Sequence, residues 1–175
     1  MDLGLIQLYT GDGKGKTTAA FGQAIRCAGN NNKVIIFQFL KGKDSGESLF
    51  LENNEYIELY HLNIEGSFSW RKSKEAEDLV IAEIHMAMDY VKEIIKYDRC
   101  DMLVLDEIVH VFKREYYSLK DFVALLKERP QIMEVILTGR GAMEELYDIA
   151  DLVTEMKKIK HPFDEGIKAR QGIEY

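Results

Sequence analysis

The chain has 175 residues, of which 46% are apolar and 30% charged, and its 30 acidic against 23 basic side chains give a net charge of −7. This is the composition of one globular domain, and it excludes a disordered chain and a protein whose main task is to coat nucleic-acid phosphates. We therefore expect a single domain over residues 1–175 that binds no nucleic acid.

The apolar runs, such as 34–37 and 102–105, are too short to cross a bilayer. The first residues, 1–4, carry no basic region followed by an apolar stretch, so we expect no secretion signal and a cytoplasmic location. Cys27 and Cys100 lie far apart in the sequence and are interpreted as buried thiols.

Apolar runs rich in β-branched and aromatic residues predict strands at 3–9, 33–40, 56–62, 101–109, 133–138 and 152–157. Helical spacing predicts helices at 17–28, 73–97, from 118 to just before Pro130, and 142–150. Ser73 and Ser118 are expected N-caps. The stretch 41–54 is polar and is assigned no element, 66–72 is expected to be a loop, and 160–175 has no clear period. Alternating strands and helices predict an α/β fold of three layers, with a mostly parallel sheet between helices.

A glycine-rich loop follows the first strand and opens the first helix, in the segment Thr10-Gly-Asp-Gly-Lys-Gly-Lys-Thr17. This is the context of a Walker A loop, in which backbone N–H groups, Lys16 and the helix dipole surround phosphate oxygens and Thr17 supplies a hydroxyl for Mg²⁺. Thr10 stands where the usual pattern has its first glycine. The alternative is an ordinary glycine-rich turn.

A second pair of candidate residues, Asp106 and Glu107, follows four apolar residues, as in a Walker B strand. Asp106 is the expected Mg²⁺ partner. Glu107 could instead orient an attacking water, as glutamates do in ATPases, and two acids at a strand end can also be purely structural. Together the two motifs indicate a nucleoside triphosphate and Mg²⁺, but they leave the reaction open.

Further segments of the chain point to one protein family. The chain carries Gln38-Phe-Leu-Lys-Gly, Leu105-Asp-Glu-Ile, Arg129-Pro, Leu137-Thr-Gly-Arg, Ala150-Asp-Leu-Val-Thr-Glu-Met, Lys160-His-Pro-Phe and Gly172-Ile-Glu-Tyr. With the phosphate loop, this set resembles the ATP:corrinoid adenosyltransferase family over nearly the whole chain. The resemblance implies a P-loop NTPase-like (RecA-like) fold and transfer of the 5′-deoxyadenosyl group of ATP to the cobalt of cob(I)alamin or cob(I)yrinic acid a,c-diamide, with release of triphosphate.

The resemblance also implies the site residues. Those expected to contact ATP, bound in reversed orientation, are Thr10, Gly11, Asp12, Gly13, Lys14, Gly15, Lys16, Thr17, Thr18 and Arg26. Mg²⁺, with Mn²⁺ as the alternative ion, is expected at Thr17, Asp106 and Glu107. Arg26 could equally be a solvated helix arginine.

The corrinoid side of the site is expected in the segment Gly66-Ser-Phe-Ser-Trp70, which resembles the family's Phe-x-Trp loop. Phe68 and Trp70 would displace the lower axial ligand of cobalt and, with Lys16, form the catalytic set. The alternative is that the two aromatic side chains pack in the core. The four histidines show no metal-ligand spacing and are interpreted as structural.

Two other function classes remain open at this stage. A P-loop ATPase or small-molecule kinase would need only Lys16, Thr17 and the two acids, and a non-catalytic nucleotide-binding regulator would leave the aromatic loop unexplained. The resemblance further implies a homodimer and an electron-donating flavoprotein reductase. It also implies that closure over the corrinoid differs here, because the chain begins at its first strand without the N-terminal arm of some members.

Overall fold

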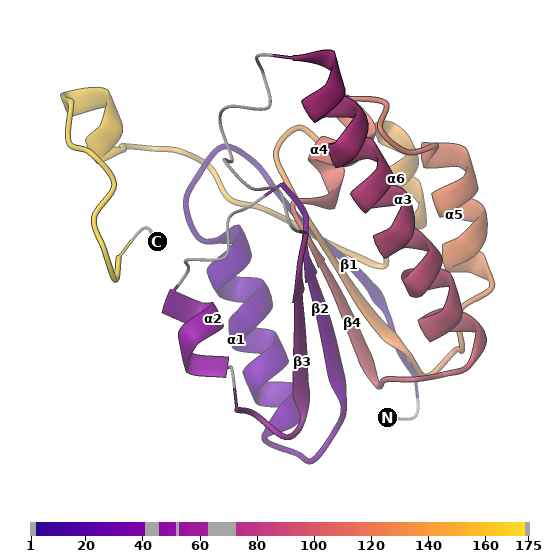
Figure 1. The fold of residues 1–175 in the computed structure, drawn as a ribbon. Helices are drawn as coiled ribbons and strands as arrows, with labels where there is room; N and C mark the ends of the chain where they lie inside the picture. Colours follow the sequence, from indigo (N-terminus) through magenta and orange to yellow (C-terminus); the bar gives the residue numbers. More distant parts are fainter. Residues whose placement is uncertain (1–2, 41–45, 52, 63–72, 174–175) are drawn as a thin grey trace.

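A computed structural model describes residues 3–40, 46–51, 53–62 and 73–173 (Figure 1). Its centre is a six-stranded sheet in the order β3-β2-β4-β5-β1-β6, and every neighbouring pair is parallel. The strands are β1 (Ile6–Thr10), β2 (Val34–Gln38), β3 (Ile57–His61), β4 (Met102–Asp106), β5 (Glu134–Thr138) and β6 (Leu152–Glu155). The predicted α/β class is confirmed, with a wholly parallel sheet where a mostly parallel one was expected.

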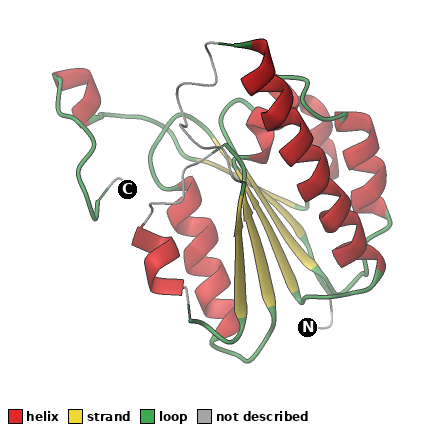
Figure 2. Ribbon diagram, viewed as in Figure 1, coloured by secondary structure: helices red, strands yellow, loops and turns green. Residues whose placement is uncertain are grey.

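Helices cover both faces of this sheet and make the outer two layers (Figures 1 and 2). One face carries α1 (Lys16–Ala28) and α2 (Gly46–Leu51). The other carries α3 (Lys74–Lys96), α4 (Ile108–Lys113), α5 (Leu119–Lys127) and α6 (Glu144–Ile149). The chain after β6 runs outward as an extended tail that contains one short 3₁₀ turn, Pro162–Glu165. No described helix has the length and apolarity needed to cross a membrane.

The central strands are apolar on both sides because each side packs under a helix layer. Every residue of β2, β4 and β5 is buried. Successive side chains of a strand point to opposite faces, so Met102 and Val104 join the cluster under α1, whereas Leu103 and Leu105 join the cluster under α3. Continuous hydrophobic runs in the sequence therefore correspond to the middle of the sheet.

Both predicted N-caps are confirmed. Ser73 Oγ accepts a hydrogen bond from the backbone N–H of Ala76 at 3.2 Å, at the start of α3. Ser118 Oγ accepts one from the N–H of Asp121, also at 3.2 Å, at the start of α5. Each serine satisfies one of the amide groups that the first turn of a helix leaves unpaired.

Several predicted element bounds were wrong, and the first strand begins at Ile6 where residue 3 was expected. The apolar stretch 101–109 is not one strand, because β4 ends at Asp106 and α4 begins at Ile108, and the chain turns at Glu107. The stretch 41–54, for which no helix was predicted, contains the six-residue α2. The last strand ends at Glu155, two residues before the predicted end, at the point where its pairing with Thr10 ends.

The fold brings the phosphate loop and the two candidate acids, Asp106 and Glu107, to the carboxyl ends of the strands. All six strands end at the same end of the sheet, and β5 lies between β1, which leads into the phosphate loop, and β4, which carries the acids. In open parallel α/β sheets, ligands bind in the crevice outside the carboxyl ends of the strands.

Candidate nucleotide-binding site

The loop between β1 and α1 presents a bare helix N-terminus. Gly15 is the N-cap of α1, with φ at 118°, and no side chain caps the helix there. The amide groups of the first turn and the positive end of the helix dipole are thus available to an anion. Lys16 is buried beneath this loop, where its Nζ donates to the carbonyl oxygens of Gly11 and Gly13 at 2.7 Å each.

Two glycines of the loop are required by the backbone of Met156, which lies against the loop just after β6. A Cβ at Gly11 would lie 2.5 Å from the carbonyl oxygen of Met156, and a Cβ at Gly13 would lie 2.6 Å from the same atom. The Gly13 N–H donates to that oxygen at 2.6 Å, and the Met156 N–H donates to Thr10 O at 2.8 Å. The amide of Gly13 therefore holds the loop against the chain after β6, whereas the sequence predicted that it would turn toward phosphate.

Asp106 lies at the centre of a hydrogen-bonded network at the ends of three neighbouring strands. Its carboxylate is fully buried and accepts from Thr138 Oγ1 at 2.7 Å and from Gln38 Nε2 at 3.0 Å. Thr17 Oγ1, in the first turn of α1, donates to the same carboxylate at 3.0 Å. Strand pairing aligns Gln38 with Asp106, and the two-residue period turns both side chains toward α1.

Glu107 occupies a strained backbone position beside this network. Its φ of 63° and ψ of 17° are left-handed values that non-glycine residues adopt at a cost, and such strain concentrates at functional sites. Its N–H donates to Thr138 Oγ1 at 2.8 Å, and its carboxylate pairs with His110 Nε2 at 3.0 Å. The turn directs the Glu107 side chain into the cavity described below.

Lys16 is a buried cation of the site, and the guanidinium of Arg140 beside it is exposed to solvent. Burial lowers the pKa of Lys16 below its ordinary value, and the neighbouring guanidinium of Arg140 lowers it further. The carboxylates of Glu107, Asp12 and Asp106 act in the opposite direction. A polyphosphate entering the loop would relieve the repulsion between the two cations, which favours anion binding here.

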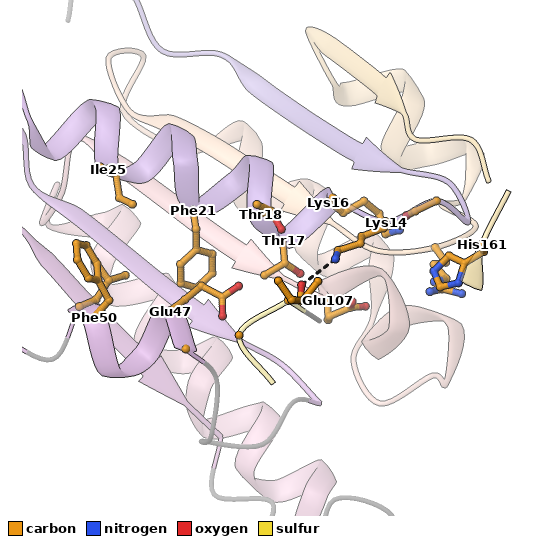
Figure 3. Close-up of a pocket in the computed structure, with 17 residues that line it drawn as sticks. Lys14, Lys16, Thr17, Thr18, Phe21, Ile25, Glu47, Phe50, Glu107 and His161 are labelled. Atoms are coloured by element: carbon orange, nitrogen blue, oxygen red, sulfur yellow. Dashed lines mark hydrogen bonds between the residues drawn. The ribbon is translucent and has the colours of Figure 1, made fainter. Parts of the chain in front are cut away.

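A cavity of about 750 Å³ opens from the phosphate loop and runs along α1 to α2 (Figure 3). Lys14 and Lys16 lie at one end, whereas Ile25 and Phe50 lie at the other, with Phe21 between them. The cavity is lined by Gly13, Lys14, Gly15, Lys16, Thr17, Thr18, Phe21, Ile25, Gly46, Glu47, Phe50, Leu51, Glu107, Arg140, His161, Gly172 and Ile173.

The C-terminal tail contributes a wall of this cavity. His161 and Ile173 both line it, although the two residues lie in a tail that is otherwise exposed to solvent. Lys14 Nζ donates to the carbonyl oxygen of Ile173 at 2.8 Å, so the phosphate loop and the tail are in direct contact (Figure 3).

The side chains present fit a hard divalent cation. Thr17 and Asp106 offer hydroxyl and carboxylate oxygens beside the phosphate loop, and these are the ligand atoms that Mg²⁺ prefers. Gln38 adds a buried amide oxygen, Oε1, that has no hydrogen-bond partner among the described residues. Within the described part of the chain, no three His, Cys, Asp or Glu side chains gather as a metal cluster. This suits an ion that keeps waters and takes phosphate oxygens as further ligands.

The structure places the predicted site residues at different distances from the cavity. Those that line it are Gly13, Lys14, Gly15, Lys16, Thr17, Thr18 and Glu107. Thr10, Gly11, Asp12 and Asp106 do not line it, and Thr10 is buried with its hydroxyl 3.5 Å from the N–H of Ala142. Arg26 is exposed in the last turn of α1, bonds Gln23 and does not line the cavity. Phe68 and Trp70 lie outside the described residues.

Three residues of the site were not assigned a role from the sequence. Gln38 and Thr138 bond Asp106 across strand neighbours, and Arg140 lines the cavity two residues after β5. All three lie within the segments that carry the family resemblance, and each lies at or just beyond the carboxyl end of an observed strand, although the strand predicted at 33–40 extended two residues past Gln38. That position was the available signal, because it is where parallel α/β sheets bind ligands.

Comparisons with known proteins agree with this geometry. Residues 2–175 match the family described as ATP:corrinoid adenosyltransferase BtuR/CobO/CobP. A corrinoid adenosyltransferase of Sinorhizobium sp. is 42% identical over 176 residues, which cover 98% of this chain and 80% of that protein. A corrinoid adenosyltransferase of Escherichia coli K12 is 38% identical over 174 residues, which cover 98% of this chain and 86% of that protein.

The fold has a relative among solved structures. A KaiC-like protein of Pyrococcus horikoshii aligns with a TM-score of 0.52 at 16% sequence identity, covering 89% of this chain and 72% of that chain. At this identity the likeness concerns the fold alone.

Proposed function

The chain belongs to the ATP:corrinoid adenosyltransferase family, and we propose that it moves the 5′-deoxyadenosyl group of ATP onto the cobalt of a reduced corrinoid with release of triphosphate. The acceptor would be cob(I)alamin or cob(I)yrinic acid a,c-diamide, in salvage or in biosynthesis of adenosylcobalamin in the cytoplasm.

The observation that carries this proposal is the two-sided character of the cavity. Its loop end combines Lys14, Lys16 and Arg140 with the N-terminus of α1, which suits a triphosphate. Its other end is lined by Ile25 and Phe50, which suits the nucleoside. We therefore place the triphosphate in the loop and the adenosine toward α2.

The chemistry requires positioning more than proton transfer. Co(I) attacks C5′ of ATP, the C5′–O bond breaks, the triphosphate leaves with the bonding electron pair, and cobalt goes formally from +1 to +3. Co(I) is itself a strong nucleophile, so no general base is needed. The protein has to hold C5′ in line with cobalt and neutralise the leaving triphosphate, and we assign the second task to Lys16, Arg140 and the loop amides.

We assign Thr17, Asp106 and Glu107 to Mg²⁺, with Mn²⁺ as the alternative. When bound, the ion supplies positive charge against the triphosphate. The Thr17 hydroxyl can keep its hydrogen bond to Asp106 while its oxygen lone pair faces the ion, so the observed contact is compatible with this role.

The corrinoid side of the proposal rests on Phe68 and Trp70. They follow β3 in the sequence and precede the Ser73 cap of α3. Because β3 is parallel to its neighbour, its carboxyl end lies at the same end of the sheet as the phosphate loop. We propose that the two aromatic side chains exclude the lower axial ligand of cobalt. A homodimer and a flavoprotein electron donor complete the proposal, on the strength of the family resemblance.

The test is to mix the protein with ATP, Mg²⁺ and chemically reduced cobalamin and to follow the absorbance spectrum before and after illumination. We expect a light-sensitive alkylcobalt spectrum and triphosphate as the inorganic product. Release of orthophosphate or ADP without a corrinoid would instead identify an ATPase or kinase, in which Glu107 orients water.

A further inference from the structure

The buried side chain of Gln38 uses one end of its amide in a hydrogen bond and leaves the other end without a partner among the described residues. Its Nε2 donates to Asp106 Oδ2 at 3.0 Å, and its Oε1 is buried without a hydrogen-bond partner among the described residues. Gln38 has no solvent exposure. A carboxylate cannot donate, so the NH₂ end must face Asp106 and the oxygen must face away from it.

The unpartnered oxygen restricts the kind of group that can bond to it. Buried polar atoms are almost always hydrogen-bonded, so an orphaned acceptor indicates a partner that the described protein groups do not supply. Phosphate oxygens are acceptors themselves and cannot satisfy Gln38 Oε1. The partner must therefore be a donor or a cation.

The surroundings of Gln38 identify that partner. Gln38 and Asp106 are paired residues at the ends of β2 and β4, and Thr17 bonds the same carboxylate from α1. Mg²⁺ gives up its waters reluctantly and is usually held by one or two carboxylates plus phosphate oxygens, with several waters retained.

We propose that Gln38 is a positioning residue for the metal: its Nε2 orients Asp106, and its Oε1 accepts a hydrogen bond from a water of the Mg²⁺ hydration shell. This inference rests on the proposed function, since it needs the Mg²⁺ site assigned above. It adds a role that the motifs do not contain, because Gln38 belongs to neither the Walker A nor the Walker B segment.

The test measures metal affinity without turnover. ATP binding is titrated by calorimetry at increasing Mg²⁺, and the rise in melting temperature that Mg²⁺ and ATP produce is recorded in parallel. In Gln38→Met, which removes both amide ends at similar length, the Mg²⁺ concentration for half-maximal binding should rise about tenfold or more, as is usual when an outer partner of a metal site is lost.

Two further variants separate the metal role from a structural one. Gln38→Glu keeps an acceptor oxygen, and because two buried carboxyl groups this close share one proton, it can also keep a donor to Asp106; it should melt lower without metal yet keep the Mg²⁺-dependent rise in melting temperature. The control Gln7→Met removes an amide that bonds Glu134 away from the site, and it should leave the Mg²⁺ titration unchanged.

The inference is overturned if folded Gln38→Met titrates with Mg²⁺ as the unaltered protein does, or if Gln38→Glu loses the Mg²⁺-dependent rise. It is also overturned if the unaltered protein binds ATP without Mg²⁺ dependence. Failure of the proposed function looks different: the Mg²⁺ titrations would follow these expectations, but no alkylcobalt product would form.

Discussion

Replacing Thr138 by valine should remove two buried hydrogen bonds without changing the volume of the side chain. The Thr138 hydroxyl donates to Asp106 Oδ1 at 2.7 Å and accepts from the N–H of Glu107 at 2.8 Å, and the residue has no solvent exposure. The first bond ends on a carboxylate and contributes about 1.5–3 kcal/mol, and the second, between neutral groups, contributes about 1 kcal/mol.

The expected loss of unfolding free energy in Thr138→Val is therefore about 3 kcal/mol. For a chain of this length, each kcal/mol shifts the melting temperature by about 2–4 °C, which gives a drop of about 6–12 °C. Urea unfolding followed by circular dichroism at pH 7 measures the free energy, and a thermal scan measures the shift. The variant should also weaken Mg²⁺ binding, because Glu107 loses the contact that holds its left-handed backbone.

The matched control is Thr138→Ser, which keeps the hydroxyl and removes only a methyl group. It should retain most of the stability that valine loses. A valine variant within about 0.5 kcal/mol of the unaltered protein, or a serine variant as unstable as the valine variant, would refute this account of the Asp106 network.

Three further predictions address other parts of the site and the core. Lys16→Ala should lower kcat/KM by the equivalent of about 2–4 kcal/mol through loss of charge-assisted contacts to triphosphate, and normal turnover at saturating ATP would contradict the loop assignment. Replacing Phe68 and Trp70 together by alanine should lower the rate of the reaction that starts from Co(II) much more than the rate from Co(I), because Co(I) already lacks a lower ligand. ATP binding should be retained, and an equal loss of rate from both starting states would indicate a packing role. Burial raises the pKa of Cys100 to about 12 and raises the pKa of Cys27 as well, so both thiols stay protonated at pH 8. Neither should react with dithionitrobenzoate until guanidinium unfolds the chain, and rapid labelling of the native protein would contradict this.

Much of the fold was predictable because local signals agree with the tertiary structure. The glycine-rich loop between a strand and a helix, and the serine caps of α3 and α5, need only neighbouring residues to be recognised. The central strands are continuous apolar runs because both of their faces are covered.

The missed elements lacked such signals. Helix α2 has only six residues, and Leu49 and Phe50 in it are about three-quarters exposed, at 76% and 77%, so no buried stripe marks it in the sequence. The change from β4 to α4 occurs inside an apolar run, and it depends on the left-handed backbone of Glu107. No propensity favours that conformation for glutamate, and contacts from β5 hold it.

The site residues that belong to short local motifs were predictable from the sequence. Those that reach the site only through the pairing of neighbouring strands were not. Lys16, Thr17 and Asp106 follow from two short motifs, and the structure brings Thr17 and Asp106 together. Gln38 and Thr138 meet Asp106 only because β2, β4 and β5 lie side by side in one register. That order comes from long-range strand pairing, which the sequence pattern does not reveal.

The central claim is that the bond broken in ATP is C5′–O and that cobalt receives the carbon. Phosphorus NMR of a single-turnover mixture of protein, ATP, Mg²⁺ and cob(I)alamin, with the alkylcobalt product counted by its loss of absorbance on illumination, tests this most directly. We predict one triphosphate for each light-sensitive cobalt–carbon bond, and no orthophosphate or ADP. ADP or orthophosphate in amounts that match the ATP consumed, with no alkylcobalt product, would contradict the proposed transfer.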